Sequence, residues 1–402
     1  MLLEFTVGNY RSFKDRKTLS LEASGISEFE DNIFEKAGYK ILKSAVIYGA
    51  NSSGKSNLLN AFKAMREIVS TSASKTSTDK IKVFPFLLST ETEYEPSFFE
   101  IVFLVDSIRY RYGFEATETG ITAEWLYEKK KVKEFELFTR IGEGIDISTK
   151  FEEGKGLEQK TRKNALFLAT VDQFNGKVSH SIMEFFNKHM MLSGVDHEAN
   201  RALTMSYLRM SGLKDKMRKF IDDFKFGFES ITIDEDEEAK DNSVTTTHRK
   251  YDSNGLDVGA VDFLMSTHES SGTNKMFDMA GYIWVSLLIG FVVVIDELDA
   301  KLHPLITQAI VDLFNSKEKN PKNAQLIFVT HDTNLLNCGR FRRDQIYFAE
   351  KDQYEATDLY SLVEYKDLDD IKVRKDRKFE KDYIQGRYGA IPFVGDFSNL
   401  SF

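Results

Sequence analysis

The sequence predicts an α/β core interrupted by an antiparallel β subdomain and a helical subdomain, and three observations lead to this prediction. A short apolar strand, a glycine-containing loop and an amphipathic helix follow one another over residues 45–65. A second apolar strand, which ends in two acids, lies much further along the chain at 292–297. Between them, segments with the two-residue alternation of strands give way to a segment with helical periodicity.

Length and composition are those of a folded protein with several packed units. The chain has 402 residues, and domains usually hold about 100–200 residues. Hydrophobic residues make up 42% and charged residues 29%, which excludes a disordered or fibrous chain. The formal net charge is −9, so the chain as a whole is not built to wrap nucleic acid, and any such contact has to be local.

Cysteine usage and the N-terminus indicate a cytoplasmic protein. The single cysteine, Cys338, excludes an internal disulfide and a cysteine-based zinc site. The first 15 residues alternate apolar and polar and lack the apolar stretch of a signal peptide, so we expect a first strand there. The uncharged segment Met279–Ile295 is too short to span a bilayer and is interrupted by Gly290. We therefore expect no membrane association, and we interpret this segment as a buried helix followed by a buried strand.

The middle of the chain predicts two inserted units. Only five prolines occur and no Gly/Ser-rich linker separates the halves, so we expect interleaved domains. Residues 97–140 alternate with a period of two and break at Glu118–Gly120, which predicts antiparallel strands joined by tight turns. The acidic run Asp234–Asp241 is expected to be a solvated loop rather than a metal site. The apolar residues that predict one amphipathic helix by their three-to-four-residue spacing are Leu203, Tyr207, Met210, Met217, Phe220, Ile221 and Phe224.

The loop Gly49–Ser56, GANSSGKS, has the pattern of a phosphate-binding P-loop. Its backbone N–H groups can curl around a polyphosphate, and the start of the following helix adds partial positive charge. Lys55 would bridge the β- and γ-phosphates, and Ser56 would offer its hydroxyl to Mg²⁺. The pattern therefore predicts ATP and Mg²⁺ as cofactors, where a plain turn is the alternative. The predicted nucleotide-binding residues of this loop are Gly49, Asn51, Ser52, Ser53, Gly54, Lys55, Ser56 and Asn57.

A strand ending in two acids supplies the carboxylates that a P-loop needs. Asp296 would hold Mg²⁺ through water, and Glu297 would lie nearer the γ-phosphate and polarise the attacking water. Taken alone, an exposed acidic strand end has the same pattern. Most of the chain separates Lys55 from Asp296, whereas compact GTPases and AAA+ motors usually place the two motifs closer together.

The order of the motifs resembles a known family. The chain is similar to the stand-alone ABC-type AAA ATPases of bacterial anti-phage operons, the group to which RloA and the ATPase subunit of PARIS are similar, and more distantly to RecF and SMC heads. The resemblance covers nearly the whole chain. The segments that carry it are NYRSFKD at Asn9–Asp15, GANSSGKSNLLNAF, ESSGTNKMF, VVVIDELDAKLHP, FVTHD and RKDRKFEKDYIQGRYGAIPF. It implies a P-loop NTPase fold of the ABC/SMC-head type.

The resemblance also implies roles for residues outside the P-loop. In Glu269–Asn274, ESSGTN, it assigns Ser270, Ser271, Gly272 and Thr273 to the signature motif that binds ATP of the opposite subunit, although transporters have LSGGQ there. Asp299 would couple the two sites of a dimer, and His331 would be the switch histidine. Gln173 would sense Mg²⁺ and the attacking water, and Arg11 would lie near the nucleotide. Taken alone, ESSGTN is a helix N-cap, His331 a structural histidine and Arg11 a surface charge.

Domain boundaries follow from the positions of these motifs. We expect an N-terminal ATPase lobe with the P-loop and the β subdomain at 1–175, and a helical subdomain ending in the signature motif at 176–275. The C-terminal lobe at 276–402 would hold the acidic strand, Asp299 and His331.

The predicted function is an ATP-hydrolysing switch or sensor in anti-phage defence. Two copies would stack head to tail, with higher oligomers left open, and would control a separate effector, a Toprim-like or other nuclease, in response to a phage-derived trigger protein. A RecF/SMC-like DNA-maintenance ATPase that clamps or scans duplex DNA and a structural scaffold that barely turns over ATP stay open as alternatives. A GTPase is disfavoured, because Asp252–Gly255 fits DxxG but Asn274–Asp278 has one residue too many for NKxD. The basic clusters Lys129–Lys133, Arg340–Arg343 and Arg374–Lys378 lack dense interleaved aromatics and are interpreted as solvated faces.

Overall fold

A six-stranded sheet forms the centre of the protein. The computed structural model describes residues 1–402 except 189, 195–196, 234–243, 338, 367–371 and 393–402. The strand order is β11-β15-β16-β5-β17-β18, and all neighbours are parallel except the edge pair β17 and β18. The strands are β11 (Met190–Ser193), β15 (Val292–Asp296), β16 (Gln325–Val329), β5 (Ser44–Tyr48), β17 (Ile346–Lys351) and β18 (Thr357–Ser361). The two apolar strands expected before the P-loop and at 292–296 are confirmed as β5 and β15.

The central sheet is apolar on both faces because each face packs on a separate core. Along β5, Ala45 and Ile47 belong to one hydrophobic cluster and Val46 and Tyr48 to the other. The first cluster includes α1 (Lys55–Thr71), and the second includes α7 (Ser271–Ile289) and α8 (Pro304–Asn315). Such burial of both faces explains why the strands read as continuous apolar runs in the sequence.

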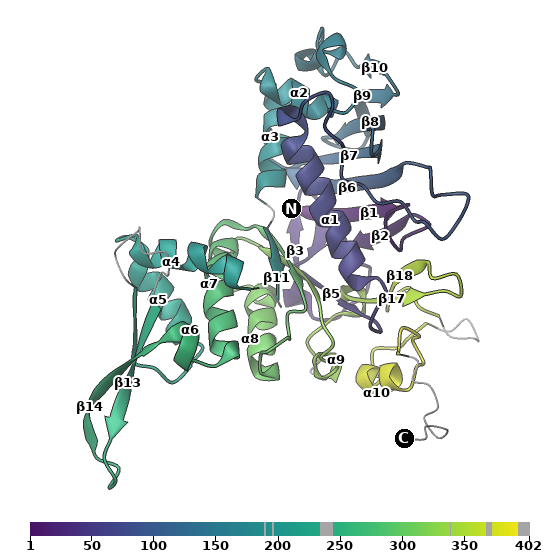
Figure 1. The fold of residues 1–402 in the computed structure, drawn as a ribbon. Helices are drawn as coiled ribbons and strands as arrows, with labels where there is room; N and C mark the ends of the chain where they lie inside the picture. Colours follow the sequence, from purple (N-terminus) through teal and green to yellow (C-terminus); the bar gives the residue numbers. More distant parts are fainter. Residues whose placement is uncertain (189, 195–196, 234–243, 338, 367–371, 393–402) are drawn as a thin grey trace, which may run out of the picture.

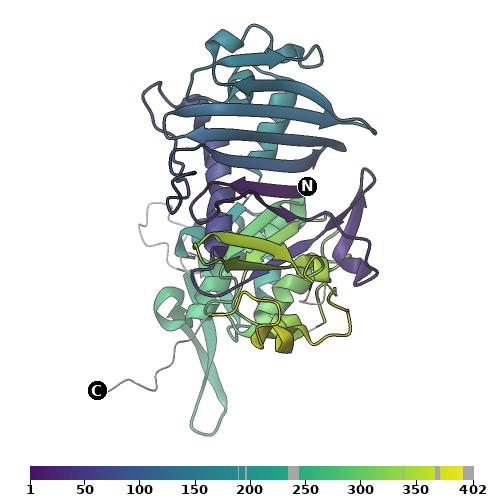
Figure 2. The same ribbon diagram turned by 90° about the vertical axis from the view of Figure 1, so that its right-hand side faces the viewer.

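A seven-stranded antiparallel sheet covers α1 on the side away from the central sheet (Figure 2). Its order is β10-β9-β8-β7-β6-β1-β2, with the turn Glu118–Gly120 between β7 and β8, so the predicted antiparallel unit and its turn are confirmed. The strands are β1 (Leu2–Gly8), β2 (Lys17–Ser20), β6 (Ser97–Val105), β7 (Ile108–Thr117), β8 (Gly120–Lys129), β9 (Phe135–Ile141) and β10 (Gly144–Ile147). The expected N-terminal strand is β1.

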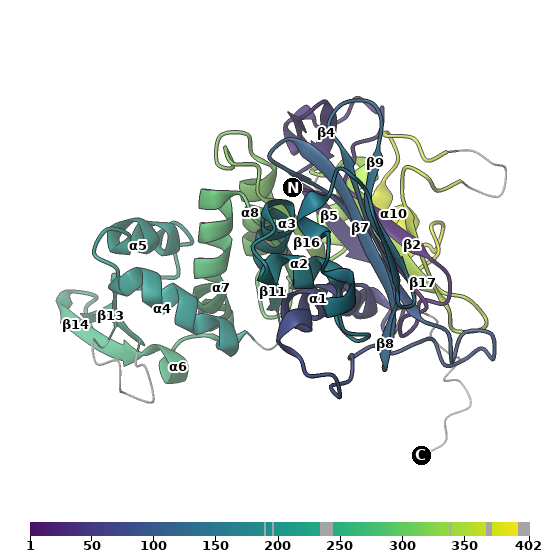
Figure 3. The ribbon, with the colours of Figure 1, turned by 90° about the horizontal axis from the view of Figure 1, so that it is seen from above.

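Smaller elements complete this lobe. A hairpin, β3 (Ile33–Lys36) and β4 (Tyr39–Leu42), stands apart from both large sheets. The helices α2 (Phe167–Gln173) and α3 (Lys177–Asn187) lie beside α1, as Figure 3 shows. Elsewhere lie α9 (Asn334–Asn337), α10 (Phe379–Ile384) and 3₁₀ turns at Glu30–Asn32, Ser72–Ser74, Glu152–Gly154, Glu158–Lys160, Glu198–Asn200 and Arg343–Gln345.

The helical subdomain projects to one side of the central sheet (Figures 1 and 3). It contains α4 (Arg201–Arg209), α5 (Lys214–Asp222), α6 (Met265–His268) and the start of α7. A three-stranded sheet, β12 (Ser230–Ile233), β13 (Val244–Tyr251) and β14 (Asp257–Leu264), extends from it as a long hairpin. The Asp252–Gly255 sequence, considered above as a GTPase motif, is the turn at the tip of this hairpin, where Asp252 Oδ1 accepts the N–H of Asn254 at 2.8 Å.

The structure corrects three expectations for this region. The single helix expected from 203 to 224 is two helices, because the chain turns at Met210–Leu213, where Leu213 N–H donates to Met210. The hairpin β13–β14 was not expected, since β14 is exposed along almost its whole length and β13 is exposed at its end. The expected 176–275 unit also includes α3 and β11, which pack in the core lobe because Phe185 stacks on Phe103 of β6 and β11 pairs with β15.

Two expectations concern residues that the structure does not describe. The acidic run Asp234–Asp241 and Cys338 both lie outside the described residues.

The buried helix and strand expected at 279–295 are α7 and β15, with Gly290 ending α7 in a left-handed conformation. Within the part of the chain that is described, none of the helices has the length and apolar character needed to cross a membrane.

Candidate functional site

The P-loop connects the end of β5 to the start of α1, at the carboxyl edge of the central sheet. Lys55 begins α1, and only 5% of the residue is exposed. Its Nζ donates to the carbonyl oxygens of Gly49 and Ala50, at 2.8 Å each. Burial lowers the pKa of Lys55, although the carboxylates of Asp296, Glu297 and Asp299 oppose this shift. The ammonium is therefore held inside the loop, where it interacts electrostatically with three carboxylates.

The exposed part of the loop presents donors for an anion. Asn51, Ser52 and Ser56 are exposed, whereas Ser53 and Gly54 are buried. The first N–H groups of α1 have no carbonyl partner within the helix, as in every α-helix. Together with the helix dipole, they form an anion-binding site at the start of α1. This geometry fits the predicted phosphate-binding role of the loop.

Two residues that the sequence did not reveal brace the P-loop from outside. Gly54 has a φ of 104°, and a Cβ there would lie 2.1 Å from Thr357 Oγ1. Thr357 is hydrogen-bonded through Oγ1 to the Ser53 carbonyl oxygen at 3.0 Å, and its N–H donates to the Ser12 carbonyl oxygen at 2.7 Å. Asn57 Nδ2 donates to Ser12 Oγ at 2.8 Å. Ser12, Thr357 and Asn57 therefore fix the conformation of Ser53 and Gly54.

Asp296 and Glu297 lie at the same edge of the sheet. Val46 of β5 pairs with Phe328 of β16, which pairs with Ile295 of β15, so the three strands end side by side. Neighbouring strands are about 4.8 Å apart, which places the end of β15 about two such spacings from the P-loop. Asp296 Oδ1 is buried and has no hydrogen-bond partner among the described residues. A buried carboxylate oxygen in this condition needs a cation or water, so the donor set fits Mg²⁺.

The end of β11 also reaches this edge, and no local sequence pattern indicates it. Ser193 pairs with Asp296 in the parallel register, and the Gly194 N–H donates to the Asp296 carbonyl oxygen at 2.7 Å. The four residues of β11 are too few for a periodic signal. The available signal was topological, because ligands of open α/β sheets bind at the carboxyl ends of the strands.

Asp299 and His331 face each other across the loops that follow β15 and β16. The backbone N–H of His331 donates to both carboxylate oxygens of Asp299, at 3.3 Å each. Desolvation and the Lys55 ammonium lower the pKa of His331, whereas Asp299, Glu297 and Asp296 oppose this shift. The net lowering favours a neutral imidazole at pH 7. Lys55, Asp296, Glu297, Asp299 and His331 thus lie close enough together for their charges to interact.

The chain matches the family model described as "AAA domain, putative AbiEii toxin, Type IV TA system" over residues 44–337. This match spans more than half of the 402 residues. The chain belongs to this family of AAA-type ATPases. No curated protein matches the sequence. The family supports a P-loop NTPase with a nucleotide-binding ATPase domain, and ATP and Mg²⁺ are what such ATPases generally use.

The motif Glu269–Asn274 of this AAA-type ATPase lies at the start of α7. Ser270 caps the helix by accepting the N–H of Thr273 at 3.1 Å. Ser270 and Ser271 are exposed, while Thr273 is buried. The helix start is next to α6 and also touches the loop after β15, since a Cβ on Gly272 would lie 2.7 Å from the Lys301 carbonyl oxygen. Figure 1 shows α7 and the start of α1 on opposite sides of α8. Among the described residues, no hydrogen bond joins Ser270 or Ser271 to Lys55, Asp296 or Glu297, and Ser270 bonds within its own helix start.

Gln173 and Arg11, the two remaining candidates for the nucleotide site, lie in different parts of the structure. Gln173 ends α2 and donates from Nε2 to the Ala73 carbonyl oxygen at 3.2 Å, beyond the C-terminal end of α1. A helix of this length places its ends about 25 Å apart, so the assignment of Gln173 to the nucleotide site is corrected. Arg11 is next to the bracing residue Ser12, and its guanidinium lies over the rings of Tyr10 and Phe84 at 5.8 and 5.2 Å.

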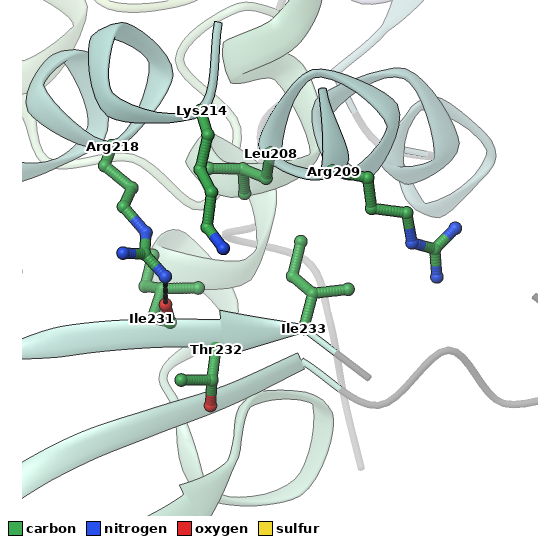
Figure 4. A pocket seen from close by; sticks show the side chains of 7 residues that line it. All are labelled: Leu208, Arg209, Lys214, Arg218, Ile231, Thr232 and Ile233. Atoms are coloured by element: carbon green, nitrogen blue, oxygen red, sulfur yellow. Dashed lines mark hydrogen bonds between the residues drawn. The ribbon is translucent and has the colours of Figure 1, made fainter. Parts of the chain in front are cut away.

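A separate cavity of about 420 Å³ lies in the helical subdomain (Figure 4). It is formed by α4, α5 and β12. The residues that line it are Leu208, Arg209, Lys214, Arg218, Ile231, Thr232 and Ile233. Lys214 and Arg218 reach from α5 toward β12, where Arg218 donates to the Ile231 carbonyl oxygen at 3.0 Å. This lining, as far as the structure describes it, contains no carboxylate, histidine or cysteine, so it offers charge for an anion but no acid–base chemistry.

Proposed function

We propose that the chain is an ABC-type ATPase head that binds ATP with Mg²⁺, pairs head to tail with a second copy, and separates after hydrolysis. It would act as a nucleotide-dependent switch or sensor in bacterial anti-phage defence. The output would come from a separate effector, a Toprim-like or other nuclease, after a phage-derived trigger acts on the dimer. ATP would hold the dimer together because it contacts both copies, and hydrolysis would release it.

The start of α7 carries this proposal. Ser270 and Ser271 are exposed at a capped helix N-terminus, which is suited to bind an anion, yet they lie apart from the P-loop of their own chain. If these serines contact a nucleotide, it is the one held by another copy. The complete cluster of Lys55, Asp296 and Glu297 then provides one half of each site, and the start of α7 provides the other half.

The chemistry assigned to the cluster is the attack of water on the γ-phosphate. Lys55 and the first turn of α1 bind the phosphates, and Asp296 and Ser56 would hold Mg²⁺, which neutralises phosphate charge when bound. Glu297 polarises the water and accepts its proton. His331, kept neutral, donates a hydrogen bond to the γ-phosphate, while Asp299 holds the backbone of His331.

The proposed role in defence is supported by the family description and by the resemblance stated above. The family is described as a putative toxin of a type IV toxin–antitoxin system. A test is to purify this chain alone and measure cleavage of DNA and RNA with Mg²⁺ or Mn²⁺, alongside toxicity on expression. We expect neither. Strong cleavage that persists in Lys55→Ala would show a catalytic centre in this chain and contradict a separate effector.

The shared site is tested by mixing two inactive variants. Ser271→Arg should retain ATP binding but block ATP-driven association and hydrolysis, and Lys55→Ala should lose ATP binding. A heterodimer of the two contains one intact site, formed by the P-loop of the Ser271→Arg chain and the α7 start of the Lys55→Ala chain. ATP turnover should therefore reappear on mixing. A mixture that stays inactive, although both variants are folded, would count against the head-to-tail arrangement.

A further inference from the structure

The loop that follows β15 is held by α7, and we infer that Lys275 of α7 is a positioning residue for the carboxylate of Glu297. This inference rests on the proposed function, in which Glu297 polarises the attacking water. Lys275 does not reach the phosphates, because its ammonium is fully occupied by the backbone of the loop.

All three donors of Lys275 are used by one short segment. Its Nζ donates to the carbonyl oxygens of Glu297 at 3.0 Å, Leu298 at 2.9 Å and Ala300 at 2.6 Å. An ammonium group has three N–H donors, so the three bonds exhaust its capacity. The residue is 0% exposed, and charged hydrogen bonds inside a protein are stronger than neutral ones in water. Lys275 therefore draws three carbonyl groups of the loop toward one point.

The backbone at Glu297 needs such support. Glu297 has a φ of 51°, in the left-handed region, which is a strained conformation for a residue other than glycine. Strained conformations of this kind persist only when their surroundings hold them. The turn is closed by the Ala300 N–H, which donates to the Glu297 carbonyl oxygen at 3.2 Å. The same φ sets the direction in which the Glu297 side chain leaves the backbone, so the loop conformation determines where its carboxylate lies.

Two further contacts join α7 to this loop. A Cβ on Gly272 would lie 2.7 Å from the Lys301 carbonyl oxygen, so the first turn of α7 touches the end of the loop. One turn beyond Lys275, Asp278 accepts a hydrogen bond from His197 Nδ1 at 2.7 Å, and His197 Nε2 lies 3.4 Å from Lys301 Nζ. The first turns of α7 therefore contact the loop directly, and the turn with Asp278 is connected to it through His197. The helix that begins at the proposed contact with the second copy also holds Glu297 in place.

The chain contains a matched control for Lys275. Lys43 is 1% exposed, and its Nζ donates to the carbonyl oxygens of Asp31 at 2.7 Å and Asn315 at 3.2 Å. Like Lys275, it is a buried lysine bonded to backbone carbonyl groups. It precedes β5, at the amino end of the central sheet, whereas the P-loop lies at the carboxyl end. Lys43 therefore has the structural role without the catalytic location.

The experiment compares Lys275→Met with Lys43→Met in the full chain. Both variants remove an ammonium and leave buried carbonyl groups without a donor, so both should lower the melting temperature. ATP affinity should stay within about twofold of wild type in both, because the P-loop is unchanged. The kcat of Lys275→Met should fall about 100-fold, as expected for a catalytic group displaced by about 1 Å, while that of Lys43→Met should stay within about twofold.

A milder pair of variants decides the matter if Lys275→Met does not fold. Lys275→Gln and Lys43→Gln keep two donors on a shorter side chain, and we expect kcat to fall in the first only. Equal kcat in the two folded variants of either pair would overturn the inference. Wild type and Glu297→Gln are measured beside them. If wild type hydrolyses no ATP, or Glu297→Gln hydrolyses it at the wild-type rate, the proposed function fails first, and this outcome is distinct from failure of the Lys275 inference.

Discussion

The brace between Thr357 and the P-loop yields a prediction whose size follows from the structure. Thr357 is 2% exposed, and its hydroxyl lies 3.0 Å from the Ser53 carbonyl oxygen and 2.8 Å from Ser12 Oγ. Thr357→Val keeps the shape of the side chain but leaves the Ser53 carbonyl without this partner. An unsatisfied buried polar group costs about 1–3 kcal/mol, so the free energy of unfolding should fall by this amount.

The same substitution should weaken ATP binding. Ser53 and Gly54 form the wall of the phosphate-binding loop, and without the brace the loop can leave the conformation that accepts phosphate. If ATP can bind only after the loop has returned to this conformation, the free energy of that return is lost from ATP binding. Each 1.4 kcal/mol lost in this way raises Kd about tenfold. Urea unfolding measures the first effect, and titration with a fluorescent ATP analogue measures the second.

Two controls separate the hydroxyl from the rest of the side chain. Thr357→Ser keeps the hydroxyl and should restore most of the ATP affinity. Thr307 is 0% exposed, and its Oγ1 has no hydrogen-bond partner within the described residues, so Thr307→Val removes a buried hydroxyl without breaking a bond. We expect that control to leave stability unchanged or raised. If Thr357→Val matched Thr307→Val in both stability and ATP affinity, the brace would have no role in shaping the P-loop.

Three further predictions concern the P-loop and the carboxylates. Lys55→Ala should abolish ATP binding measured by calorimetry, since the ammonium supplies much of the phosphate recognition, and an unchanged Kd would refute the P-loop assignment. Glu297→Gln should keep ATP bound but slow phosphate release by orders of magnitude, because the amide has the shape of the acid without its basicity; wild-type turnover would place the base elsewhere. Removal of Mg²⁺ with EDTA should stop hydrolysis, and Asp296→Asn should raise the Mg²⁺ concentration needed for half-maximal rate, whereas an unaltered Mg²⁺ requirement would exclude Asp296 from the metal site.

The parts of the site that the sequence predicted are those whose residues are adjacent in the chain. The P-loop holds its strand, loop and helix within one short segment, so its pattern specifies both the residues and their geometry. Two further strands can be recognised because each is buried on both faces and therefore apolar throughout. One of them ends in Asp296, and the other lies just before His331. Lys55, Asp296 and His331 meet because parallel strands bring their carboxyl ends to one edge.

The parts that the sequence did not predict depend on contacts between distant segments. Ser12 and Thr357 meet through bonds that span 345 positions, and neither has a local pattern that indicates this contact. Gln173 was assigned from its place between two subdomains, but its helix lies at the far end of α1. The hairpin β13–β14 was missed because β14 is exposed on both faces, and such a strand has no hydrophobic periodicity.

The buried ion pair between α7 and α4 leads to a last prediction, which concerns the stability of the helical subdomain. Asp278 is 0% exposed and accepts hydrogen bonds from Arg201 Nε and His197 Nδ1, at 2.7 Å each. Burial raises the pKa of Asp278, and the hydrogen bonds from Arg201 and His197 oppose this shift. Asp278→Asn keeps the shape and removes the charge, which leaves Arg201 without its counterion. Breaking a buried pair in this way costs about 3–5 kcal/mol, and the 20% exposure of the Arg201 side chain favours the lower end, about 3 kcal/mol.

The two tryptophans of the chain can report where this loss acts. Trp284 lies in α7 with its ring 5.3 Å from Tyr207 of α4, whereas Trp125 lies in the antiparallel sheet and donates from Nε1 to Glu100 at 2.8 Å. Single-tryptophan variants, Trp125→Phe and Trp284→Phe, let urea unfolding be followed in each half separately. With a slope of about 1–3 kcal/mol per molar urea, a loss of about 3 kcal/mol moves the midpoint by about 1–3 M. We expect this shift for the Trp284 signal and a smaller one for Trp125, because α4, α5 and the hairpin connect to the rest of the protein mainly through α7 and can open as a unit. Equal shifts of both signals would mean that the two halves unfold together, and no shift of either would mean that the ion pair contributes nothing to holding α4 on α7.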